Sequence, residues 1–191
     1  MKYEVVITSK NSKTNEDNRA PIGVYYKNNK ILVAHLYEGS HTYENLKNED
    51  YFIINICSPY LIAESVLNDE GNYGHLEYND CLIPYLKDSY KIYLAKINNR
   101  KIIESKNDYG NSKLMIVEST IILEKDLKYP PFKPYNRAVG LIVEMAVLYS
   151  RLNIVNDEKR KKIKEEMENY FKIIKKVGSE KYINLGKKFL E

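Results

Sequence analysis

The chain has 191 residues and a net charge of +4; with 43% hydrophobic and 29% charged residues it is long enough for one full domain core and too apolar to remain disordered. Its two cysteines, Cys57 and Cys81, are too few for a disulfide framework, and its three histidines lack the spacing of a helical metal site. No apolar run is long enough to cross a membrane and the N-terminus has the pattern of a strand, so we expect a reduced, cytoplasmic protein with no metal ion and no membrane contact.

Seven segments in the first two thirds of the chain are rich in β-branched and aromatic residues, as strands are. They cover residues 4–8, 21–26, 30–36, 51–57, 90–97, 100–105 and 113–123. Short runs of turn-forming residues at 27–29, 98–99 and 107–111 predict antiparallel hairpins between neighbouring strands. Because no long helix separates the strands, the pattern predicts a closed or half-open β-barrel over residues 1–126.

Residues 58–88 interrupt this pattern. They predict a short helix followed, over residues 71–86, by a loop with scattered apolar anchors. An insertion of this length into a barrel is often part of a binding site or of a dimer contact.

A proline-rich stretch at 127–136 ends the barrel pattern, and we expect a helical extension over residues 127–191. Residues 137–153 are apolar almost all round, so they predict a buried helix. A second helix begins at an Asn156 or Asp157 cap and ends at Gly178 in the C′ position. Its apolar stripe consists of Ile163, Met167, Tyr170, Phe171, Ile174 and Val177.

The charge surplus lies on the same C-terminal segment. Residues 156–191 contain 11 Lys or Arg and 7 Asp or Glu, which accounts for the whole net charge. The two signs alternate, as they do on a solvated helix face. The pattern favours such a face over a nucleic-acid interface, so we expect no nucleic-acid partner.

Pro21 and Gly23 interrupt an otherwise regular strand. A strand that contains both residues usually lies at a sheet edge, at a bulge, or where a flat ligand approaches the backbone. At an edge, exposed backbone N–H and C=O groups can hydrogen-bond a heterocycle. An ordinary bulge is the alternative.

The segment GSHTYENL, from Gly39 to Leu46, carries more hydrogen-bonding side chains than a turn between two strands requires. If Ser40 begins a helix, its hydroxyl, the Thr42 hydroxyl and the first backbone N–H groups converge where the helix dipole is positive, which favours an anion. The alternative is that Ser40 only caps the helix, a contribution of about 1 kcal/mol. The pattern leaves both possibilities open.

Several sequence blocks occur in the order seen in a known family. They are NRAPIGVYY (18–26), GSHTYENL (39–46), YFIINI (51–56), DYGNSKLMIVE (108–118) and KPYNRAVGLIVEM (133–145). With these blocks the chain resembles, over nearly its whole length, the archaeal family called domain of unknown function 447 (DUF447), in the FMN-binding split-barrel group of flavoproteins. The resemblance implies a mainly β protein with helices: an antiparallel split β-barrel of six or seven strands, a C-terminal helical segment, and a homodimer that holds FMN at the subunit interface.

The resemblance also implies roles for individual residues. Ala20, Pro21, Ile22 and Gly23 would line the isoalloxazine ring, and Gly39, Ser40, His41, Thr42 and Asn45 would hold the phosphate and the ribityl chain. Asn55 matches an asparagine of related flavoproteins, and a polar residue on the solvent face of its strand is the alternative. Asn136 and Arg137 would pair with the phosphate across the dimer, with a surface salt bridge as the alternative for Arg137.

We therefore expect an FMN-binding, nucleotide-binding flavoprotein that acts as a flavin-dependent oxidoreductase with an unknown substrate or protein redox partner. The alternative is a non-catalytic FMN carrier, sensor or electron-transfer protein. A flavin supplies the redox chemistry itself, so no catalytic residue is assigned. The chain has no GxGxxG nicotinamide fingerprint, and His75 is expected to be a solvated loop residue.

Overall fold

A computed structural model describes residues 2–11, 13–28, 30–107, 110–131 and 136–191. The chain divides into two units, which we call the barrel unit (Met1–Cys57 with Asn68–Pro130) and the helical unit (Ser58–Leu67 with Pro131–Glu191). The barrel unit contains all the strands, and the helical unit contains every helix except α1. Part of the predicted proline-rich connection, residues 132–135, and part of the predicted turn at 107–111, residues 108–109, lie outside the described residues.

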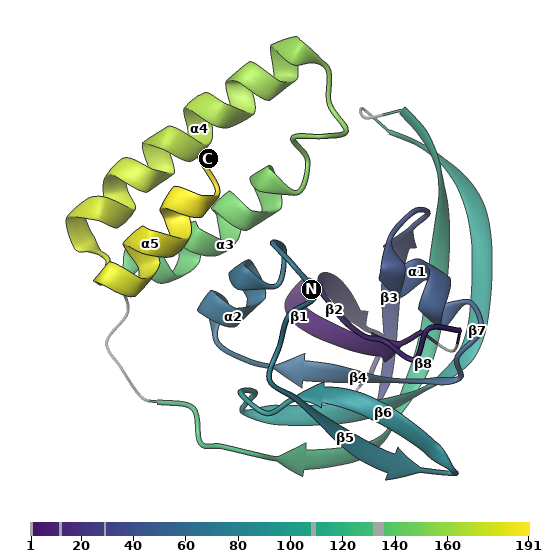
Figure 1. Cartoon of the computed structure of the whole chain (residues 1–191). Coiled ribbons are helices and arrows are strands. Elements are labelled where there is room, and N and C mark those ends of the chain that lie inside the picture. Colours follow the sequence, from purple (N-terminus) through teal and green to yellow (C-terminus); the bar gives the residue numbers. More distant parts are fainter. Residues whose placement is uncertain (1, 12, 29, 108–109, 132–135) are drawn as a thin grey trace. The chain divides into compact units, whose positions relative to one another are not determined.

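Six antiparallel strands close the barrel in the order β1-β2-β3-β8-β7-β4 (Figure 1). They are β1 (Lys2–Lys10), β2 (Asp17–Tyr26), β3 (Ile31–Tyr37), β4 (Tyr51–Ile56), β7 (Lys91–Asn107) and β8 (Gly110–Asp126). Side chains alternate between the two faces of each strand, and the inward set, including Val5, Ile7, Val24 and Leu32, forms the barrel core. The predicted antiparallel barrel is confirmed.

The predicted turn at residues 98–99 is wrong. β7 runs through these residues as one strand paired with β8, with register shifts between Leu94 and Ala95 and between Ile97 and Asn99. A bulge of this kind places an extra residue in one strand and bends it without ending it. Two predicted strands, 90–97 and 100–105, therefore belong to one element.

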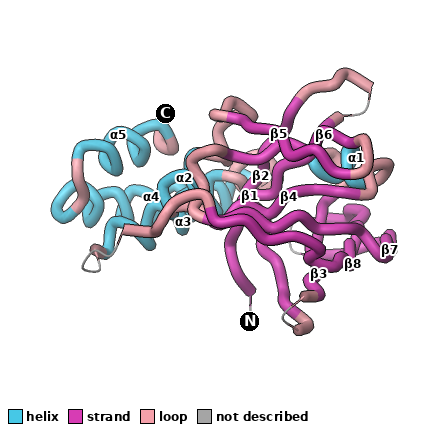
Figure 2. Tube along the Cα trace, turned by 90° about the horizontal axis from the view of Figure 1, so that it is seen from below, coloured by secondary structure: helices cyan, strands magenta, loops and turns pink. Residues whose placement is uncertain are grey.

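The predicted loop at residues 71–86 is also wrong, because β5 (Tyr73–Tyr78) and β6 (Cys81–Leu86) form a hairpin. Asn79 and Asp80 connect the two strands with positive φ angles of 47° and 62°, as a tight hairpin turn requires. Gly74 is needed opposite Tyr85, because a Cβ atom there would lie 2.5 Å from the tyrosine ring. The hairpin lies along the outside of β4 and β1 (Figure 2), where Ile83 packs with Ile53, Ile92 and Leu94.

Helix α1 (His41–Leu46) follows β3 and belongs to the barrel unit. It packs against β1, β2 and β3, and it contributes Tyr43 and Leu46, both almost fully buried, to the barrel core. These buried apolar side chains therefore hold α1 against the barrel. The contacts of its polar residues depend on the strands around the helix.

The helical unit consists of α2 (Pro59–Glu64), α3 (Arg137–Tyr149), α4 (Asp157–Val177) and α5 (Glu180–Lys188). Both predicted C-terminal helices are confirmed, and α5 is an additional helix. α4 ends at Gly178 as predicted, but Gly178 is the C-cap with a φ of −83° and not the C′ residue. Among residues of α3, Ala138, Ile142, Met145 and Ala146 are fully buried, so this helix buries one face rather than its whole surface. No helix within the described residues is both long and apolar enough to span a membrane.

Candidate functional site

The wall of the barrel is incompletely paired between β2 and β3. β2 pairs with β1 from Lys10 opposite Asp17 to Lys2 opposite Tyr25, but it pairs with β3 only from Val24 to Tyr26. The part of β2 before Val24 therefore has an edge that no other described strand covers, and we call this place the β2–β3 split. The pairing of β2 with β1 shows no register shift, so the edge interpretation of Pro21 and Gly23 is confirmed and the bulge alternative is wrong.

Residues 20–23, predicted to line a flavin ring, lie along this edge. All four are half-buried, so they are neither enclosed in the core nor fully exposed. Backbone N–H and C=O groups at an uncovered edge are available to a ligand, and the short side chains of Ala20 and Gly23 allow a flat group to approach closely. The arrangement suits a planar heterocycle.

The other side of the split is the end of β3 and the turn into α1. Gly39 has a φ of +91°, a left-handed conformation that favours glycine. Ser40 is the N-cap: its hydroxyl accepts a hydrogen bond from the Tyr43 backbone N–H (3.2 Å) and donates one to the Tyr37 carbonyl (3.0 Å). The capping role of Ser40 is confirmed, and because α1 has only six residues its dipole is a weak argument for an anion.

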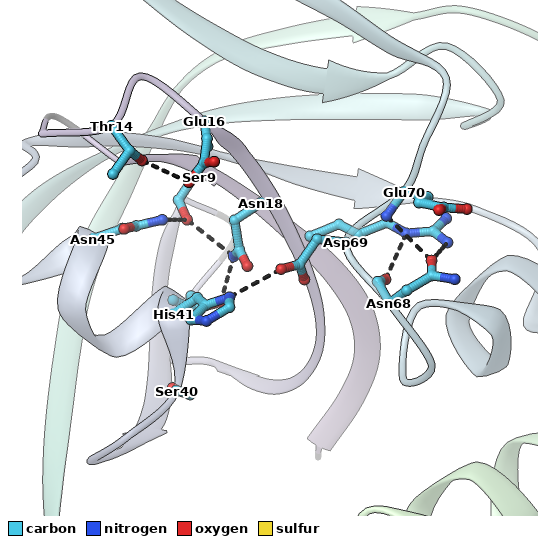
Figure 3. Close-up of polar contacts among 12 residues, drawn as sticks. Ser9, Thr14, Glu16, Asn18, Ser40, His41, Asn45, Asn68, Asp69 and Glu70 are labelled. Carbon is cyan, nitrogen blue, oxygen red and sulfur yellow. Dashed lines mark hydrogen bonds and ion pairs between the residues drawn. The ribbon is translucent and has the colours of Figure 1, made fainter.

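Thr42 and Asn45 are buried, with 1% and 5% of their surface exposed. The Asn18 side-chain amide donates to the Thr42 hydroxyl (2.9 Å) and to the Ser9 hydroxyl (3.3 Å), and the Asn45 amide donates to the same Ser9 hydroxyl (3.1 Å). We call Ser9, Asn18, Thr42 and Asn45 the buried amide network (Figure 3). It ties α1 to β1 and β2, so Thr42 and Asn45 position the helix instead of presenting their polar atoms at the surface.

His41 is directed away from this network. Its side chain is 75% exposed, and its Nδ1 lies 2.9 Å from Asp69 Oδ2 (Figure 3). Asp69 belongs to a short loop, residues 68–72, that Arg19 holds in place through Nε to the Asn68 carbonyl (3.3 Å) and Nη2 to Asn68 Oδ1 (3.2 Å). Among Ser40, His41, Thr42 and Asn45, His41 is thus the residue with an exposed side chain.

A second histidine–aspartate pair lies on the neighbouring strands. His75 is on β5, not in a loop as predicted, and its Nε2 lies 2.8 Å from Asp17 Oδ2. The other oxygen, Asp17 Oδ1, is buried and has no hydrogen-bond partner among the described residues. Burial raises the pKa of nearby Tyr73 to about 12; the Arg19 guanidinium opposes this shift, and the Asp69 and Asp17 carboxylates add to it.

Asn55 has a different role from the one expected. Its amide is fully buried and donates to the Val6 carbonyl (3.1 Å) and to the Thr8 hydroxyl (2.9 Å). Its oxygen accepts from the Leu86 N–H (2.8 Å) and from the Ser89 hydroxyl (3.3 Å). The solvent-face alternative is therefore wrong, and with its hydrogen-bonding capacity used the side chain ties the hairpin to the barrel.

Asn136 and Arg137 lie in the helical unit. The Asn136 side chain caps α3 by accepting from the Ala138 N–H (2.9 Å), and it donates to the Val177 carbonyl at the end of α4 (2.8 Å). Arg137 is the exposed first residue of α3. Their contact with a phosphate stays a prediction.

Sequence patterns did not single out Ser9, Asp17, Asn18, Arg19 or Asp69 as site residues. The signal was the polar run Asp17-Asn18-Arg19 at the start of an otherwise apolar strand, directly before Ala20. Its partners come from distant segments, so only the fold shows what the run contacts. Within the described parts of the chain, no group of three or more His, Cys, Asp or Glu side chains is arranged to hold a metal ion.

The fold and the split define the class of protein. The structure is similar to nitrilotriacetate monooxygenase component B from Bacillus cereus, with a TM-score of 0.51 and 16% identity over 73% of this chain and 77% of that chain. It is similar over a greater length to an FMN-bound protein from Methanosarcina mazei assigned to DUF447, with a TM-score of 0.80 and 18% identity over 98% of this chain and 93% of that chain. The barrel is thus a split barrel of the type seen in flavin-reductase-like proteins.

The sequence comparisons give the family. The model of the N-terminal domain of the protein of unknown function DUF447 matches residues 3–126, and a second DUF447 model matches residues 136–187. An uncharacterised protein from Methanocaldococcus jannaschii is 48% identical over 187 residues, which are 96% of this chain and 93% of that protein. The chain belongs to the DUF447 family, as its sequence blocks indicated.

Proposed function

We propose that this protein binds FMN at the β2–β3 split and acts as a flavin-dependent oxidoreductase. The observation that carries the proposal is the family member from Methanosarcina mazei, whose structure is described as FMN-bound and which shares this fold over 98% of the present chain. The β2–β3 split supports the proposal independently. The predicted ring-lining segment of β2 lies on one side of the split, and the predicted phosphate segment after β3 lies on the other.

Two groups of residues would contact FMN, one at the ring and one at the phosphate. Ala20, Pro21, Ile22 and Gly23 would face the ring, and Gly39, Ser40 and His41 would face the phosphate, with His41 as the accessible side chain. Thr42 and Asn45 would support this segment through the buried amide network. Asn55 is left out of the proposed site because its amide is fully bonded within the protein.

When bound, FMN would supply the electron transfer, and this chain would bind and orient it. A homodimer with FMN at the interface is part of the proposal, with Asn136 and Arg137 pairing with the phosphate across the dimer. Two aromatic side chains on β2 and β3 support a protein contact there: Tyr25 is 39% exposed and Tyr37 is 52% exposed. Exposed tyrosines are enriched at protein interfaces because the ring buries apolar area while the hydroxyl keeps a partner.

A second candidate is a non-catalytic FMN carrier or electron-transfer protein. It rests on the same FMN-bound relative, because a bound cofactor supports FMN binding and does not by itself support a particular reaction. Oxidation of NADH or NADPH by the flavin-loaded protein at a catalytic rate would support the oxidoreductase. Reduction only by an external reductant, with no turnover, would support the carrier.

The proposal is tested by the absorbance of the purified protein and by mass spectrometry of the compound that heat releases. We expect a flavin spectrum, FMN as the released compound, one FMN per chain after titration of the apoprotein, and a molar mass of two chains by light scattering. A colourless protein that does not take up added FMN would contradict the function, and a flavin-loaded monomer would contradict the dimer alone.

A further inference from the structure

The outer face of β2 continues the proposed flavin site in the N-terminal direction. Alternate residues of a strand share a face, so Asp17, Arg19, Pro21 and Gly23 lie on one side of β2. This is the side away from the barrel core, because Val24 points into the core and because Thr8, which pairs with Arg19, bonds to the Pro84 carbonyl of the hairpin (2.6 Å). Pro21 and Gly23, two of the residues predicted to line the ring, thus lie on the same face of β2 as Asp17 and Arg19. Arg19 is only 4% exposed, and the Lys2 side chain lies over Gly23.

The charged residues at the start of this face belong to a polar cluster. We define the outer polar cluster as Asp17, Arg19, Asp69, Tyr73 and His75, contributed by β2, the 68–72 loop and β5. His75 contacts Asp17 (2.8 Å), and the Tyr73 hydroxyl donates to the Asp69 backbone carbonyl (2.6 Å). Arg19 bonds to Asn68, the residue before Asp69. The outer polar cluster therefore consists of charged and phenolic groups whose positions are held by hydrogen bonds.

One atom of this cluster lacks a partner. Asp17 Oδ2 is held by His75, whereas Asp17 Oδ1 is buried and has no hydrogen-bond partner in the described part of the chain, and the whole side chain is 17% exposed. A carboxylate oxygen only accepts hydrogen bonds, and a buried acceptor without a donor is costly. The position therefore suits a ligand group that donates a hydrogen bond and is not itself an anion.

The cluster also connects the two ends of the proposed FMN site. Arg19 is two residues before Pro21 on the same face, and Asp69 contacts His41, the accessible residue of the phosphate segment. The part of FMN between the ring and the phosphate is the ribityl chain, whose hydroxyl groups are hydrogen-bond donors. Resting on the proposed function, we propose that Asp17 is a binding residue that accepts a hydrogen bond from a ribityl hydroxyl, with His75 as the positioning residue that holds its carboxylate.

The same geometry separates the ribityl chain from the phosphate. Asp17 carries a negative charge, and a second negative charge at close range is unfavourable. At the other end, the Asp69 carboxylate is already paired with His41. A phosphate is therefore placed at the His41 end and a neutral polyol at the Asp17 end. FMN and riboflavin share the ribityl chain, whereas lumiflavin has only the ring, so the three flavins together locate the contact.

The experiment measures dissociation constants of the full-length apoprotein for FMN, riboflavin and lumiflavin, by quenching of flavin fluorescence. Asp17→Ala removes the acceptor, and Asp17→Asn keeps the shape and one neutral acceptor. We expect Asp17→Ala to raise the dissociation constants of FMN and riboflavin equally, by about tenfold or more, with Asp17→Asn intermediate and lumiflavin unchanged. Asp88→Asn, a change at an exposed carboxylate paired with Lys128, is the matched control and leaves all three constants unchanged.

The possible results separate the two proposals. Unchanged affinity for FMN and riboflavin in both Asp17 variants would overturn this inference and leave the proposed function intact. Tighter binding of FMN relative to riboflavin in Asp17→Asn would also overturn it, because it would place the phosphate beside Asp17. A folded wild-type protein that binds none of the three flavins would overturn the proposed function and this inference together. His75→Ala, which removes the partner of Asp17, should raise the constants for FMN and riboflavin by about threefold, again without an effect on lumiflavin.

Discussion

Successive residues at the start of β2 lie on opposite faces of the strand, and the two faces have different surroundings. On the inner side, Asn18 joins the buried amide network, whose members are all neutral, at most 5% exposed and bonded to one another. On the outer side, Asp17 and Arg19 belong to the outer polar cluster, which is charged and includes an acceptor oxygen without a partner among the described residues, although Arg19 is itself only 4% exposed. The inner residues therefore hold α1 on the barrel, whereas Asp17 on the outer side keeps the acceptor oxygen for which we propose a ligand hydroxyl.

The largest expected effect concerns the inner side. Asn18→Ala removes the donor shared by Ser9 and Thr42 and leaves a buried gap, so the free energy of unfolding should fall by about 2 kcal/mol. Urea denaturation measures this change. Asn48→Ala, at an exposed asparagine next to α1, is the control and should change stability by less than about 0.5 kcal/mol. An equal effect of the two changes would show that the network does not stabilise the fold.

A pair of neighbouring changes on α1 sharpens the comparison. His41→Gln alters an exposed side chain and should weaken FMN binding by about fivefold, leave riboflavin binding unchanged and barely change stability. Thr42→Val alters a buried hydroxyl and should lower the free energy of unfolding by about 1 kcal/mol with less than about a twofold effect on FMN binding. If Thr42→Val instead weakens FMN binding by tenfold at unchanged stability, Thr42 contacts the phosphate directly and the positioning role is wrong.

The smallest effect is a pH dependence within the outer polar cluster. An unfolded tyrosine ionises near pH 10, whereas burial raises the pKa of Tyr73 to about 12 in the folded protein. The stabilisation from the neutral phenol is therefore complete below pH 10 and is lost as the pH rises toward 12. Tyr73→Phe should show a smaller loss of stability than the wild type over this interval in urea titrations, and Tyr129→Phe, at a 96% exposed residue, should behave as the wild type does. If all three proteins lost the same amount of folding stability between pH 10 and pH 12, burial would not raise the pKa of Tyr73 as described.

Local sequence patterns predicted elements whose residues are periodic. The strands of the barrel and the helices α3 and α4 were anticipated because alternation and helical stripes are properties of consecutive residues. The predictions failed where one local pattern fits two structures. Asn98 and Asn99 are equally suited to a turn and to a bulge, and pairing of β7 with β8 decided for the bulge. Pro84 and Gly74 concealed the β5–β6 hairpin, because both residues normally weaken a strand.

For the site, the sequence by itself determined the family and the barrel with its helical extension, because these follow from residue order. The sequence left an edge and a bulge open for Pro21 and Gly23, and the strand pairing decided for the edge. Only the tertiary structure decided which polar residues are enclosed and which are accessible. Thr42 and His41 are adjacent in the chain, yet one bonds to Asn18 in the interior and the other meets Asp69 near the surface. Hydrogen bonds between residues so far apart in sequence form only after the apolar core has brought their strands together, so no local pattern reveals them.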